Sequence, residues 1–399
     1  MSKNNIIFIS TYAYLSNPEF FAITPYLKEF RKIYFNPNDG VAKEVDEFNK
    51  LHLNKENILK FFDIYIELKP IDLTVKRIWN KFRVIREYIK MIYTYLNKIK
   101  PEAVISCSDR TLSNKIIISW CKKKNIPFII IQPAFIDSIF SKPLGFKHLF
   151  KYIVYNKIFR MPYSTRQNLF GNEDESSYLL LWSKYFSLNP KRKNMFFIGN
   201  PAFDNLFKQF SSKRTIKKNI IICTEIIDEL FGRELFNMVN EIYLKAIESK
   251  PDFKFYIKLH PRDEMSKYVE VFNRNKFSNI EVVKVANLYD LFKLSDIQLS
   301  VNSFSSLEAV AMGLPIIIVN PNNLIPFNDY FREEVNLKAI NKKEIPKKIE
   351  IALSDEYWQQ FLKQREKYFN KMFFSIDGQS GKRAADLIKL LINKKSYKE

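Results

Sequence analysis

The 399-residue sequence is poor in the residues that build disulfide frameworks, metal centres and glycine-rich nucleotide loops. It contains three cysteines, three histidines and eight glycines. Cys107, Cys121 and Cys223 lack CxxC spacing, and an odd number of cysteines argues against a disulfide framework. HExxH, GxSxG, GxGxxG and Walker A motifs are absent, which argues against zincins, serine hydrolases, NAD dehydrogenases and P-loop hydrolases. We therefore expect a protein of the reducing cytoplasm that needs neither a metal ion nor a resident cofactor.

Long apolar runs are also missing. No stretch reaches the roughly eighteen consecutive apolar residues that a membrane-spanning helix needs. The apolar run near the N-terminus is about six residues long, which is too short for the core of a signal peptide. What the chain does have is 46% hydrophobic residues, enough for packed cores, and a length that favours two domains of roughly 150 to 200 residues each.

The charge is strongly positive, with 64 basic and 43 acidic residues and a net charge of +21. Such an excess attracts nucleic acid, anionic lipid or anionic sugar substrates. No zinc-finger spacing, RNP-type strand or basic zipper is present, so we expect no nucleic-acid partner. The segment Ser141–Tyr163 alternates aromatic and aliphatic residues with Lys and Arg, and it suits either an anionic membrane surface or a core helix with a basic solvent face. We expect a cytoplasmic protein that can bind peripherally at the inner face of the cytoplasmic membrane.

Strand-like and helix-like patterns alternate along both halves of the chain, which predicts an α/β fold with two Rossmann-like, doubly wound domains facing a cleft. In the first half the clearest helix is Val75 to Ile99, where apolar residues recur at spacings of three and four. The polar, basic stretch Lys208 to Lys218 reads as the linker. We predict a first domain over 1–207, a second domain over 208–375 and, over 376–399, a helix that crosses back to the first domain.

Strands are predicted at intervals through both halves. In the first half they are Asn5–Ser10, Lys32–Asn36, Phe62–Leu68, Ala103–Cys107, Pro127–Gln132, Leu179–Trp182 and Met195–Ile198. In the second half they are Asn219–Cys223, Lys254–Leu259, Ile280–Val285, Ile297–Val301 and Pro315–Val319, with one continuous helix from about Asp228 to Glu248 between the first two. A further helix is expected to start near Ser303 and to end by Gly313, and the tail is expected to be helical.

Two segments of the second half carry the strongest chemical pattern. In FKFYIKLHPRDE a strand ends at Lys258, His260 and Pro261, and in SVNSFSSLEAVAMGLP a strand is followed by the serines 303, 305 and 306 at the start of a helix. Ligands of open α/β sheets bind at the carboxyl ends of the strands, and helix N-termini attract anions. The pattern predicts a phosphate-bearing ligand, although serines at such a turn also serve as simple helix caps.

The neighbouring Glu308 lies one turn into that helix, where it could accept hydrogen bonds from ribose hydroxyl groups or stand as a solvated glutamate. In the first half, Asp109 follows an apolar strand and precedes a helix, so it is either a general base or a helix cap. The next strand along the chain ends near Gln132 and Asp137, which gives a candidate substrate-binding amide and a second candidate base. The turn GNPAFD, over 199–204, most simply positions a hinge.

The order of these motifs resembles the GT-B glycosyltransferase superfamily. The matching pieces, which run in this order along the chain, are GNPxxD (Gly199–Asp204), KxHP (Lys258–Pro261), LYDLFKLSD (Leu288–Asp296) and SxSSLEAxxxGxP (Ser303–Pro315). Within that superfamily the chain looks most like the capsule and lipopolysaccharide polysaccharide transferases, including bacterial sialyl- and Kdo-transferases. The resemblance implies an inverting, metal-independent transfer of a sugar from a CMP- or UDP-linked donor to a saccharide or lipid-linked saccharide acceptor. It also implies that residues 208–375 form the nucleotide-sugar-binding domain and residues 1–207 the acceptor-binding domain.

The resemblance also assigns roles to residues. His260 and the serines 303, 305 and 306 would hold the donor phosphate, with Lys258 and Pro261 beside them, and Glu308 would contact the ribose. Asp109 would be the catalytic base and Asp137 the reserve. The chain departs from many relatives in having Gln132-Pro133-Ala134 where they have Gln-His-Gly, and it lacks a clear acidic-acidic-Gly base motif in its first half.

Three other functions fit parts of the same pattern. CDP-polyol phosphotransferases of the teichoic-acid type also use a His-Pro loop and a serine-rich phosphate site. Non-hydrolysing UDP-GlcNAc 2-epimerases resemble the chain in the GNPxxD turn and the serine-rich helix, but they carry additional acidic and histidine residues in the first domain. A non-catalytic, membrane-associated protein of a polysaccharide assembly complex would account for the basic segment Ser141–Tyr163.

Overall fold

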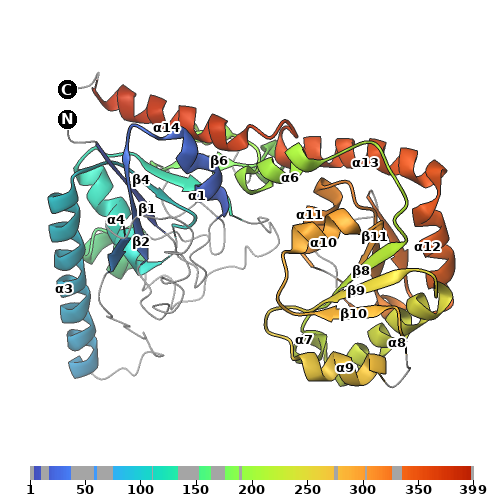
Figure 1. Ribbon diagram of the computed structural model, residues 1–399. Helices are drawn as coiled ribbons and strands as arrows, with labels where there is room; N and C mark the ends of the chain where they lie inside the picture. Colours follow the sequence, from blue (N-terminus) through green and yellow to red (C-terminus); the bar gives the residue numbers. More distant parts are fainter. Residues whose placement is uncertain are drawn as a thin grey trace. The chain divides into compact units, whose positions relative to one another are not determined.

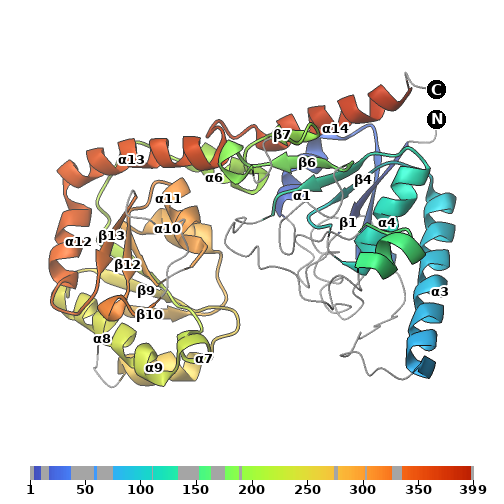
Figure 2. The ribbon, with the colours of Figure 1, turned by 180° about the vertical axis from the view of Figure 1, so that it is seen from behind.

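The computed structural model describes residues 4–9, 18–36, 58–60, 75–109, 111–133, 152–162, 176–187, 191–273, 277–301, 303–325 and 335–396. The chain forms two compact units: unit 1 comprises Met1–Asp204 and Met372–Glu399, and unit 2 comprises Asn205–Lys371. Each unit is an α/β fold built on one parallel sheet (Figures 1 and 2). The domain boundaries expected from the sequence fall after residues 207 and 375. No helix in the described ranges combines the length and the hydrophobicity that a membrane span requires.

Unit 1 contains a seven-stranded sheet in the order β3-β2-β1-β4-β5-β6-β7, and every neighbouring pair is parallel. The strand order reverses between β1 and β4, which makes their carboxyl ends the switch point of this sheet. The predicted strand Phe62–Leu68 lies outside the described residues. The strands are β1 (Asn5–Ile9), β2 (Arg31–Asn36), β3 (Ile58–Lys60), β4 (Pro101–Ser106), β5 (Phe128–Ile131), β6 (Tyr178–Leu181) and β7 (Met195–Phe197).

The helices of unit 1 include α3 over the residues that the periodicity predicts. They are α1 (Pro18–Ile23), η1 (Thr24–Tyr26), α3 (Val75–Ile99), α4 (Leu112–Lys123), η5 (Val154–Ile158), η6 (Lys184–Phe186), η7 (Pro201–Phe203) and α14 (Ser380–Ser396). Two further helices, α6 (Asp204–Gln209) and α13 (Asp355–Phe373), cross from one unit into the other. Of the segment Ser141–Tyr163, only residues 152–162 are described.

The helix α14 completes the core of unit 1. Its Ala384, Ala385, Ile388, Leu391 and Ile392 are buried in one cluster with residues of β1, β4, β5 and α1. Burying this face removes apolar surface from water, which is the main stabilising contribution to such packing. The tail of the chain is therefore an integral part of the first unit.

The GNPxxD turn holds the start of α14 in place. Both oxygens of Asp204 accept backbone N–H bonds there, Oδ1 from Ser380 at 3.0 Å and Oδ2 from Gly381 at 2.7 Å. Arg383 adds a bond from its Nε to the carbonyl oxygen of Ile198 at 2.8 Å. Gly199 has φ +86°, and a Cβ atom on it would lie 2.3 Å from Ser380 Oγ. The turn that the sequence analysis assigned to a hinge is, within unit 1, the clamp for a helix N-terminus.

Unit 2 contains a six-stranded sheet in the order β10-β9-β8-β11-β12-β13, again with all pairs parallel. Numbered from β8, this is the 3-2-1-4-5-6 order of a Rossmann domain, with its switch point between β8 and β11. The strands are β8 (Asn219–Cys223), β9 (Lys254–Lys258), β10 (Ile280–Val283), β11 (Ile297–Ser300), β12 (Ile316–Val319) and β13 (Asn336–Ala339).

The prediction of one continuous helix from about Asp228 to Glu248 is wrong. Two helices replace it, because Gly232 adopts φ +91° and ends the first one. The helices of unit 2 are α7 (Ile227–Phe231), α8 (Arg233–Ser249), α9 (Met265–Asn273), α10 (Leu288–Leu294), α11 (Ser305–Ala311), η8 (Pro321–Asn323) and α12 (Ile345–Leu353).

Arg365 of α13 anchors the carboxyl end of α11. Its guanidinium donates from Nε to the carbonyl oxygen of Val310 at 2.8 Å and from Nη2 to that of Ala311. The same group lies 3.7 Å from the ring centroid of Phe210, and burial lowers its pKa to about 10. A cation at a helix carboxyl end offsets the unpaired carbonyl groups there. This contact holds in place the helix that follows the serine-rich turn.

Candidate functional site

The residues that follow β8, β9 and β11 lie along the carboxyl edge of the unit 2 sheet, at or beside its switch point. Thr224 follows β8, His260 lies two residues beyond β9, and Ser303 lies three residues beyond β11. Because β9, β8 and β11 are consecutive neighbours in a parallel sheet, their carboxyl ends lie along the same edge. This edge, visible in Figure 1 around β8, β9 and β11, is the position at which ligands bind open α/β sheets.

His260 is held by its backbone and by one ring nitrogen. Its backbone N–H donates to Thr224 Oγ1 at 3.0 Å, and its ring atom Nδ1 accepts a hydrogen bond from the backbone N–H of Arg262 at 3.2 Å. An Nδ1 atom that accepts a hydrogen bond carries no proton, so the neutral ring bears its proton on Nε2. Burial lowers the pKa of His260. At neutral pH the partly exposed imidazole therefore presents an uncharged N–H donor.

Lys258, predicted beside the donor phosphate, is committed to backbone groups in this arrangement. Its Nζ donates to the carbonyl oxygen of Leu259 at 2.9 Å and to that of Lys284 at 3.0 Å. Burial lowers the pKa of this ammonium. These bonds tie the loop after β9 to the loop after β10. Pro261, which follows His260, is exposed in the turn.

The serine-rich turn divides into two accessible serines and one buried serine. Ser305 begins α11, and its Oγ donates to Ser303 Oγ at 2.8 Å and accepts from Gln298 Nε2 at 3.1 Å. Ser306, in contrast, is fully buried and hydrogen-bonds Ser300 Oγ of β11 at 2.7 Å. The Ser306 hydroxyl is thus occupied by a partner within the protein, and its contact with a donor phosphate stays a prediction.

Glu308 is fixed by a tyrosine that the sequence analysis did not single out. Its Oε1 accepts a hydrogen bond from the hydroxyl of Tyr289, in α10, at 2.9 Å. Burial raises the pKa of Glu308, and burial together with the nearby carboxylate raises that of Tyr289. Glu308 is therefore not the solvated helix glutamate of the alternative interpretation. A carboxylate in this setting can still accept hydrogen bonds from ligand hydroxyl groups through its second oxygen.

Cys223 links the two halves of this edge. The thiol ends β8 and is buried, and burial raises its pKa to about 12, opposed by hydrogen bonds with the side chains of Gln298 and Ser305 and by the charge of Lys258. These neighbours place the end of β8 between Lys258 of β9 and the first turn of α11. A thiol with so high a pKa is protonated at neutral pH, which gives it a packing role and no nucleophilic one.

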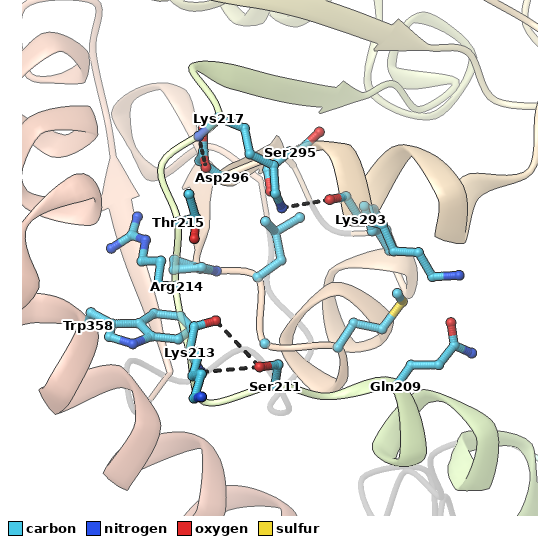
Figure 3. A pocket seen from close by; sticks show the side chains of 15 residues that line it. Gln209, Ser211, Lys213, Arg214, Thr215, Lys217, Lys293, Ser295, Asp296 and Trp358 are labelled. Carbon is cyan, nitrogen blue, oxygen red and sulfur yellow. Dashed lines mark hydrogen bonds between the residues drawn. The ribbon is translucent and has the colours of Figure 1, made fainter.

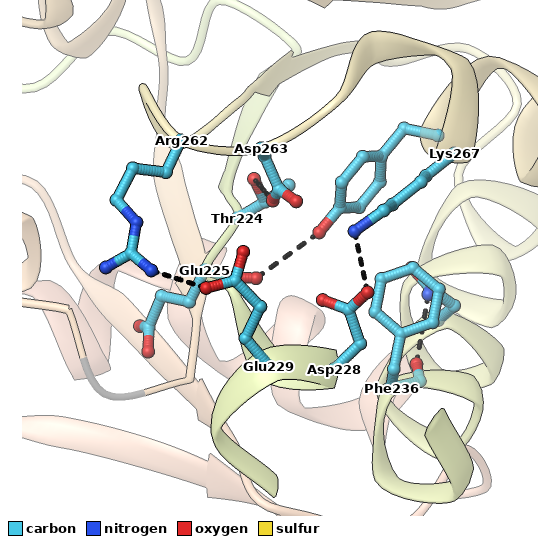
Figure 4. Close-up of polar contacts among 10 residues, drawn as sticks. Thr224, Glu225, Asp228, Glu229, Phe236, Arg262, Asp263 and Lys267 are labelled. Carbon is cyan, nitrogen blue, oxygen red and sulfur yellow. Dashed lines mark hydrogen bonds and ion pairs between the residues drawn. The ribbon is translucent and has the colours of Figure 1, made fainter. Parts of the chain in front are cut away.

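A polar cluster surrounds the loop that carries His260 (Figure 4). Thr224 donates to Asp263 Oδ2 at 3.1 Å, and Lys267 pairs with Asp228 at 2.7 Å. Arg262 forms an ion pair with Glu229 of α7. In the part of the chain that the structure describes, no group of three or more His, Cys, Asp or Glu side chains is arranged to hold a metal ion.

In unit 1, Asp109 lies just after β4, at the switch point of that sheet, and its side chain is fully buried. It does not cap α4; Thr111 does, through an Oγ1 that accepts the N–H of Asn114 at 3.2 Å. The helix-cap alternative for Asp109 is therefore wrong, and its role as a base stays a prediction. Asp137, the reserve base, lies outside the described residues.

Gln132, considered as a substrate-binding amide, is structural. Its Oε1 accepts the backbone N–H of Trp182 at 2.9 Å, and the indole of Trp182 donates to the carbonyl oxygen of Gln132 at 2.8 Å. Both residues are fully buried. The amide oxygen fixes the end of β6 to the end of β5.

Glu19 is a titratable residue that the sequence analysis missed. It lies in the first turn of α1, is 3% exposed, and burial raises its pKa to about 7. The only signal in the sequence is its place directly after Pro18, at the start of a helix that follows β1. A carboxyl group with a pKa near neutrality in the unit expected to bind the acceptor is chemically able to exchange a proton at physiological pH.

A cavity of about 250 Å³ lies on unit 2 away from the carboxyl ends of its strands (Figure 3). Its lining includes Lys217, Asp296 and Pro315, which precede β8, β11 and β12. Asp296 accepts the backbone N–H groups of Lys217 and Asn219, and Lys217 Nζ donates to the carbonyl oxygen of Lys293. These polar groups attach the linker to the amino edge of the sheet, so the cavity is separate from the predicted ligand site.

Comparison with known proteins identifies the fold of the chain but not its family. A scan of protein-family models gave no match, and a search of curated proteins gave none either. Among solved structures, the UDP-GlcNAc 2-epimerase from Methanocaldococcus jannaschii matches with 17% identity and a TM-score of 0.62, covering 97% of this chain and 99% of that one. The epimerase from Neisseria meningitidis bound to UDP-GlcNAc matches with 14% identity and a TM-score of 0.61 over 97% and 100% of the two chains.

The glycosyltransferase of kitacinnamycin is similar to the same extent, with 13% identity and a TM-score of 0.60 over 98% of this chain and 100% of that one. At such identities the likeness concerns the fold alone. The chain has a GT-B glycosyltransferase-like fold, in which each half is a Rossmann-like α/β domain, as the sequence predicted.

Proposed function

We propose that the chain is a GT-B glycosyltransferase that transfers a sugar from a nucleotide-sugar donor to a saccharide acceptor without a metal ion. The observation that carries the proposal is that His260, the Ser303–Ser305 pair and Glu308 follow parallel strands on either side of β8 and therefore belong to the same carboxyl edge of the unit 2 sheet. This edge offers uncharged hydrogen-bond donors for a phosphate and a carboxylate for sugar hydroxyl groups, and both are parts of a nucleotide-sugar donor.

The donor phosphate would lie between His260 and the serines 303 and 305. As the bond between the anomeric carbon and the phosphate oxygen breaks, negative charge develops on the leaving nucleotide. The Nε2–H of His260 and the hydroxyl of Ser303, which accepts from Ser305, would donate hydrogen bonds to this charge, and such fixed donors lower the barrier most when water is excluded. Glu308, steadied by Tyr289, would accept hydrogen bonds from the ribose hydroxyl groups.

The acceptor would bind unit 1. The resemblance implies that Asp109 is the catalytic base and that Asp137 is the second candidate for this role. An acceptor hydroxyl would attack the anomeric carbon, its proton would pass to the base, and the nucleotide would leave, with inversion at that carbon. The donor would be CMP- or UDP-linked, and the product would be part of a bacterial capsule or lipopolysaccharide. These details rest on the resemblance of the motifs to those of the GT-B polysaccharide transferases.

A UDP-GlcNAc 2-epimerase is the second candidate, because two such enzymes match over 97% of the chain. The two functions differ in what they require. An epimerase changes one carbon of the sugar and needs no acceptor, whereas a transferase releases the nucleotide only when an acceptor is present. A CDP-polyol phosphotransferase would instead release CMP and pass on a polyol phosphate.

The deciding experiment is a thermal-shift screen with CMP, CDP, UDP and their sugar conjugates, followed by product analysis with the ligand that stabilises the protein. A ligand at a hundred times its Kd stabilises the folded state by about 2.7 kcal/mol, which is easily detected. Acceptor-dependent nucleotide release supports the transferase. Acceptor-independent isomerisation of UDP-GlcNAc, or stabilisation by none of these nucleotides, contradicts it.

We also propose that unit 1 contacts an anionic membrane surface, where lipid-linked acceptors would be found. In the described part of the basic segment, Ile153 and Ile158 are 48% and 50% exposed, and Lys157 and Arg160 are exposed beside them. The segment packs on α3 through Phe159, whose ring stacks on Phe82 at 5.1 Å. Exposed isoleucines flanked by basic residues suit the interface of an anionic bilayer.

A further inference from the structure

The loop that carries His260 is closed by a ring of hydrogen bonds with Thr224 and Asp263. The backbone N–H of His260 donates to Thr224 Oγ1 at 3.0 Å, and the Thr224 hydroxyl group donates to Asp263 Oδ2 at 3.1 Å. The backbone N–H of Asp263 donates to the carbonyl oxygen of His260 at 2.9 Å, which closes the ring. Figure 4 shows Thr224 and Asp263 side by side on the strand end and the loop. Both side chains are buried, with 4% and 1% exposure.

The direction of the Thr224 hydroxyl follows from this ring. A hydroxyl has one proton and two lone pairs, and an ionised carboxylate only accepts. The carboxylate of Asp263 therefore accepts the hydrogen bond of the Thr224 hydroxyl group. This leaves a lone pair of Thr224 Oγ1 to accept the backbone N–H of His260. Without Asp263 the hydroxyl group of Thr224 could rotate. Its lone pair would then no longer be held toward the backbone N–H of His260.

The main chain of Thr224 is fixed independently of its side chain. Its N–H donates to the carbonyl oxygen of Lys258 at 3.0 Å, which continues the pairing of β8 with β9 one residue beyond both strands. Removal of the hydroxyl group alone therefore leaves the sheet in place. The substitution should instead loosen the loop of residues 260–263. It should also weaken the hydrogen bond that the His260 ring atom Nδ1 accepts from the backbone N–H of Arg262.

We infer that Thr224 and Asp263 are positioning residues for His260: they hold its loop so that Nδ1 accepts from the Arg262 amide and Nε2–H faces a bound phosphate. Neither residue touches the ligand. This inference rests on the proposed function for the phosphate, but the orientation of the ring is a property of the free protein. It can therefore be tested whether or not a nucleotide binds.

The test uses Thr224→Val, which keeps the β-branched shape and removes the hydroxyl group, and Thr224→Ser, which restores that group. The chain has only three histidines, so the ¹⁵N signals of His260 are identified by their loss in His260→Ala. We expect wild type and Thr224→Ser to show the Nε2–H tautomer. Thr224→Val should show signals averaged between the two tautomers, and its affinity for the nucleotide found in the thermal-shift screen should fall about tenfold. Retention of the wild-type tautomer in Thr224→Val overturns the inference.

The part played by Asp263 is tested by coupling. If Asp263 acts through Thr224, Asp263→Ala should disturb the His260 signals, and the Thr224→Val/Asp263→Ala double variant should disturb them no further than Thr224→Val alone. Additive changes would show that Asp263 acts independently and would overturn its assignment. A protein that binds none of the nucleotides but shows this coupling would contradict the proposed function while supporting the positioning of His260.

Discussion

Asp204 and Gly381 are 177 residues apart in the sequence, yet Oδ2 of Asp204 accepts the backbone N–H of Gly381 at 2.7 Å. The aspartate belongs to the GNPxxD turn, and the glycine belongs to the first turn of α14. With the second bond, from Ser380, one carboxylate satisfies two N–H groups that a helix N-terminus otherwise leaves unpaired. Part of the motif pattern that resembles the GT-B superfamily therefore has, in unit 1, a structural purpose that is separate from ligand binding.

Asp204→Ala should destabilise unit 1 by about 1 to 2 kcal/mol, because two buried N–H groups lose their acceptor. Asp204→Asn keeps one oxygen acceptor and should lose less. Urea denaturation followed by far-UV circular dichroism measures both. Equal stability of the alanine variant and the wild type would show that water or another group replaces the carboxylate at no cost.

Gly199→Ala should destabilise the protein more than Gly232→Ala. Both glycines have a positive φ, +86° and +91°, so both substitutions carry the strain of about 1 kcal/mol or more that a side chain incurs there. A Cβ on Gly199 would in addition meet Ser380 Oγ at 2.3 Å, whereas nothing lies within 4 Å of one on Gly232. The difference between the two variants in denaturation midpoint isolates the contact with α14. Identical losses would argue against that contact.

Glu19→Gln should stabilise the protein at alkaline pH and leave it unchanged near pH 4. Burial raises the pKa of Glu19 from 4.5 to about 7. Below the lower value the carboxyl group is protonated in both the folded and the unfolded chain. As the pH rises from there to about 7, the unfolded chain loses the proton first, and the folded state loses about 3 kcal/mol of relative stability. Glutamine cannot ionise and escapes this loss.

Unfolding free energies of Glu19→Gln and wild type, measured at pH 4.5 and pH 8, test this expectation. Glu29→Gln is the matched control, since Glu29 lies on the surface and pairs with Lys389 at 2.8 Å. The control should gain nothing at pH 8. A pH-independent difference between Glu19→Gln and wild type would contradict the raised pKa.

His260→Ala should lower turnover by about a hundredfold or more, the usual loss when one donor to developing negative charge is removed. His260→Gln should retain more activity, because its amide nitrogen can donate from near the position of Nε2. The measurement is nucleotide release in the presence of the acceptor. Turnover of the alanine variant close to that of the wild type would remove His260 from the mechanism.

The membrane contact predicts that the protein floats with vesicles containing phosphatidylglycerol and not with phosphatidylcholine vesicles. Replacement of both Ile153 and Ile158 by Asn should abolish flotation with little change in stability, since both side chains are about half exposed. Replacement of Lys157 and Arg160 by Gln should weaken flotation and its salt dependence. Equal flotation of all three proteins would contradict this surface.

Elements with a continuous local signal could be predicted from the sequence. The helix 75–99 and the strand 219–223 have the same bounds in the structure, because their apolar spacing is uninterrupted. The break at Gly232 was missed, because the apolar spacing of the flanking helices continues across it. The strand Asn336–Ala339 was missed because it is a short edge strand whose residues are mostly only partly buried.

The candidate site was predictable only where local pattern decides position. His260 and Ser303 follow apolar strands, so their place at the carboxyl edge could be inferred. The burial of Ser306 against Ser300, and the role of Thr224, depend on which strands are neighbours and which way the helix faces. That information lies in the strand order of the whole sheet and in no single segment.

The place of α14 in unit 1 also determines the order in which the chain can fold as it is synthesised. Unit 2 is one uninterrupted segment and can complete its core once residue 371 has left the ribosome. Unit 1 begins earlier but needs Ala384, Ala385 and Ile388 to fill the space over β1 and β4. We therefore expect the domain translated first to finish folding last, with apolar surface of its sheet uncovered until α14 has been synthesised.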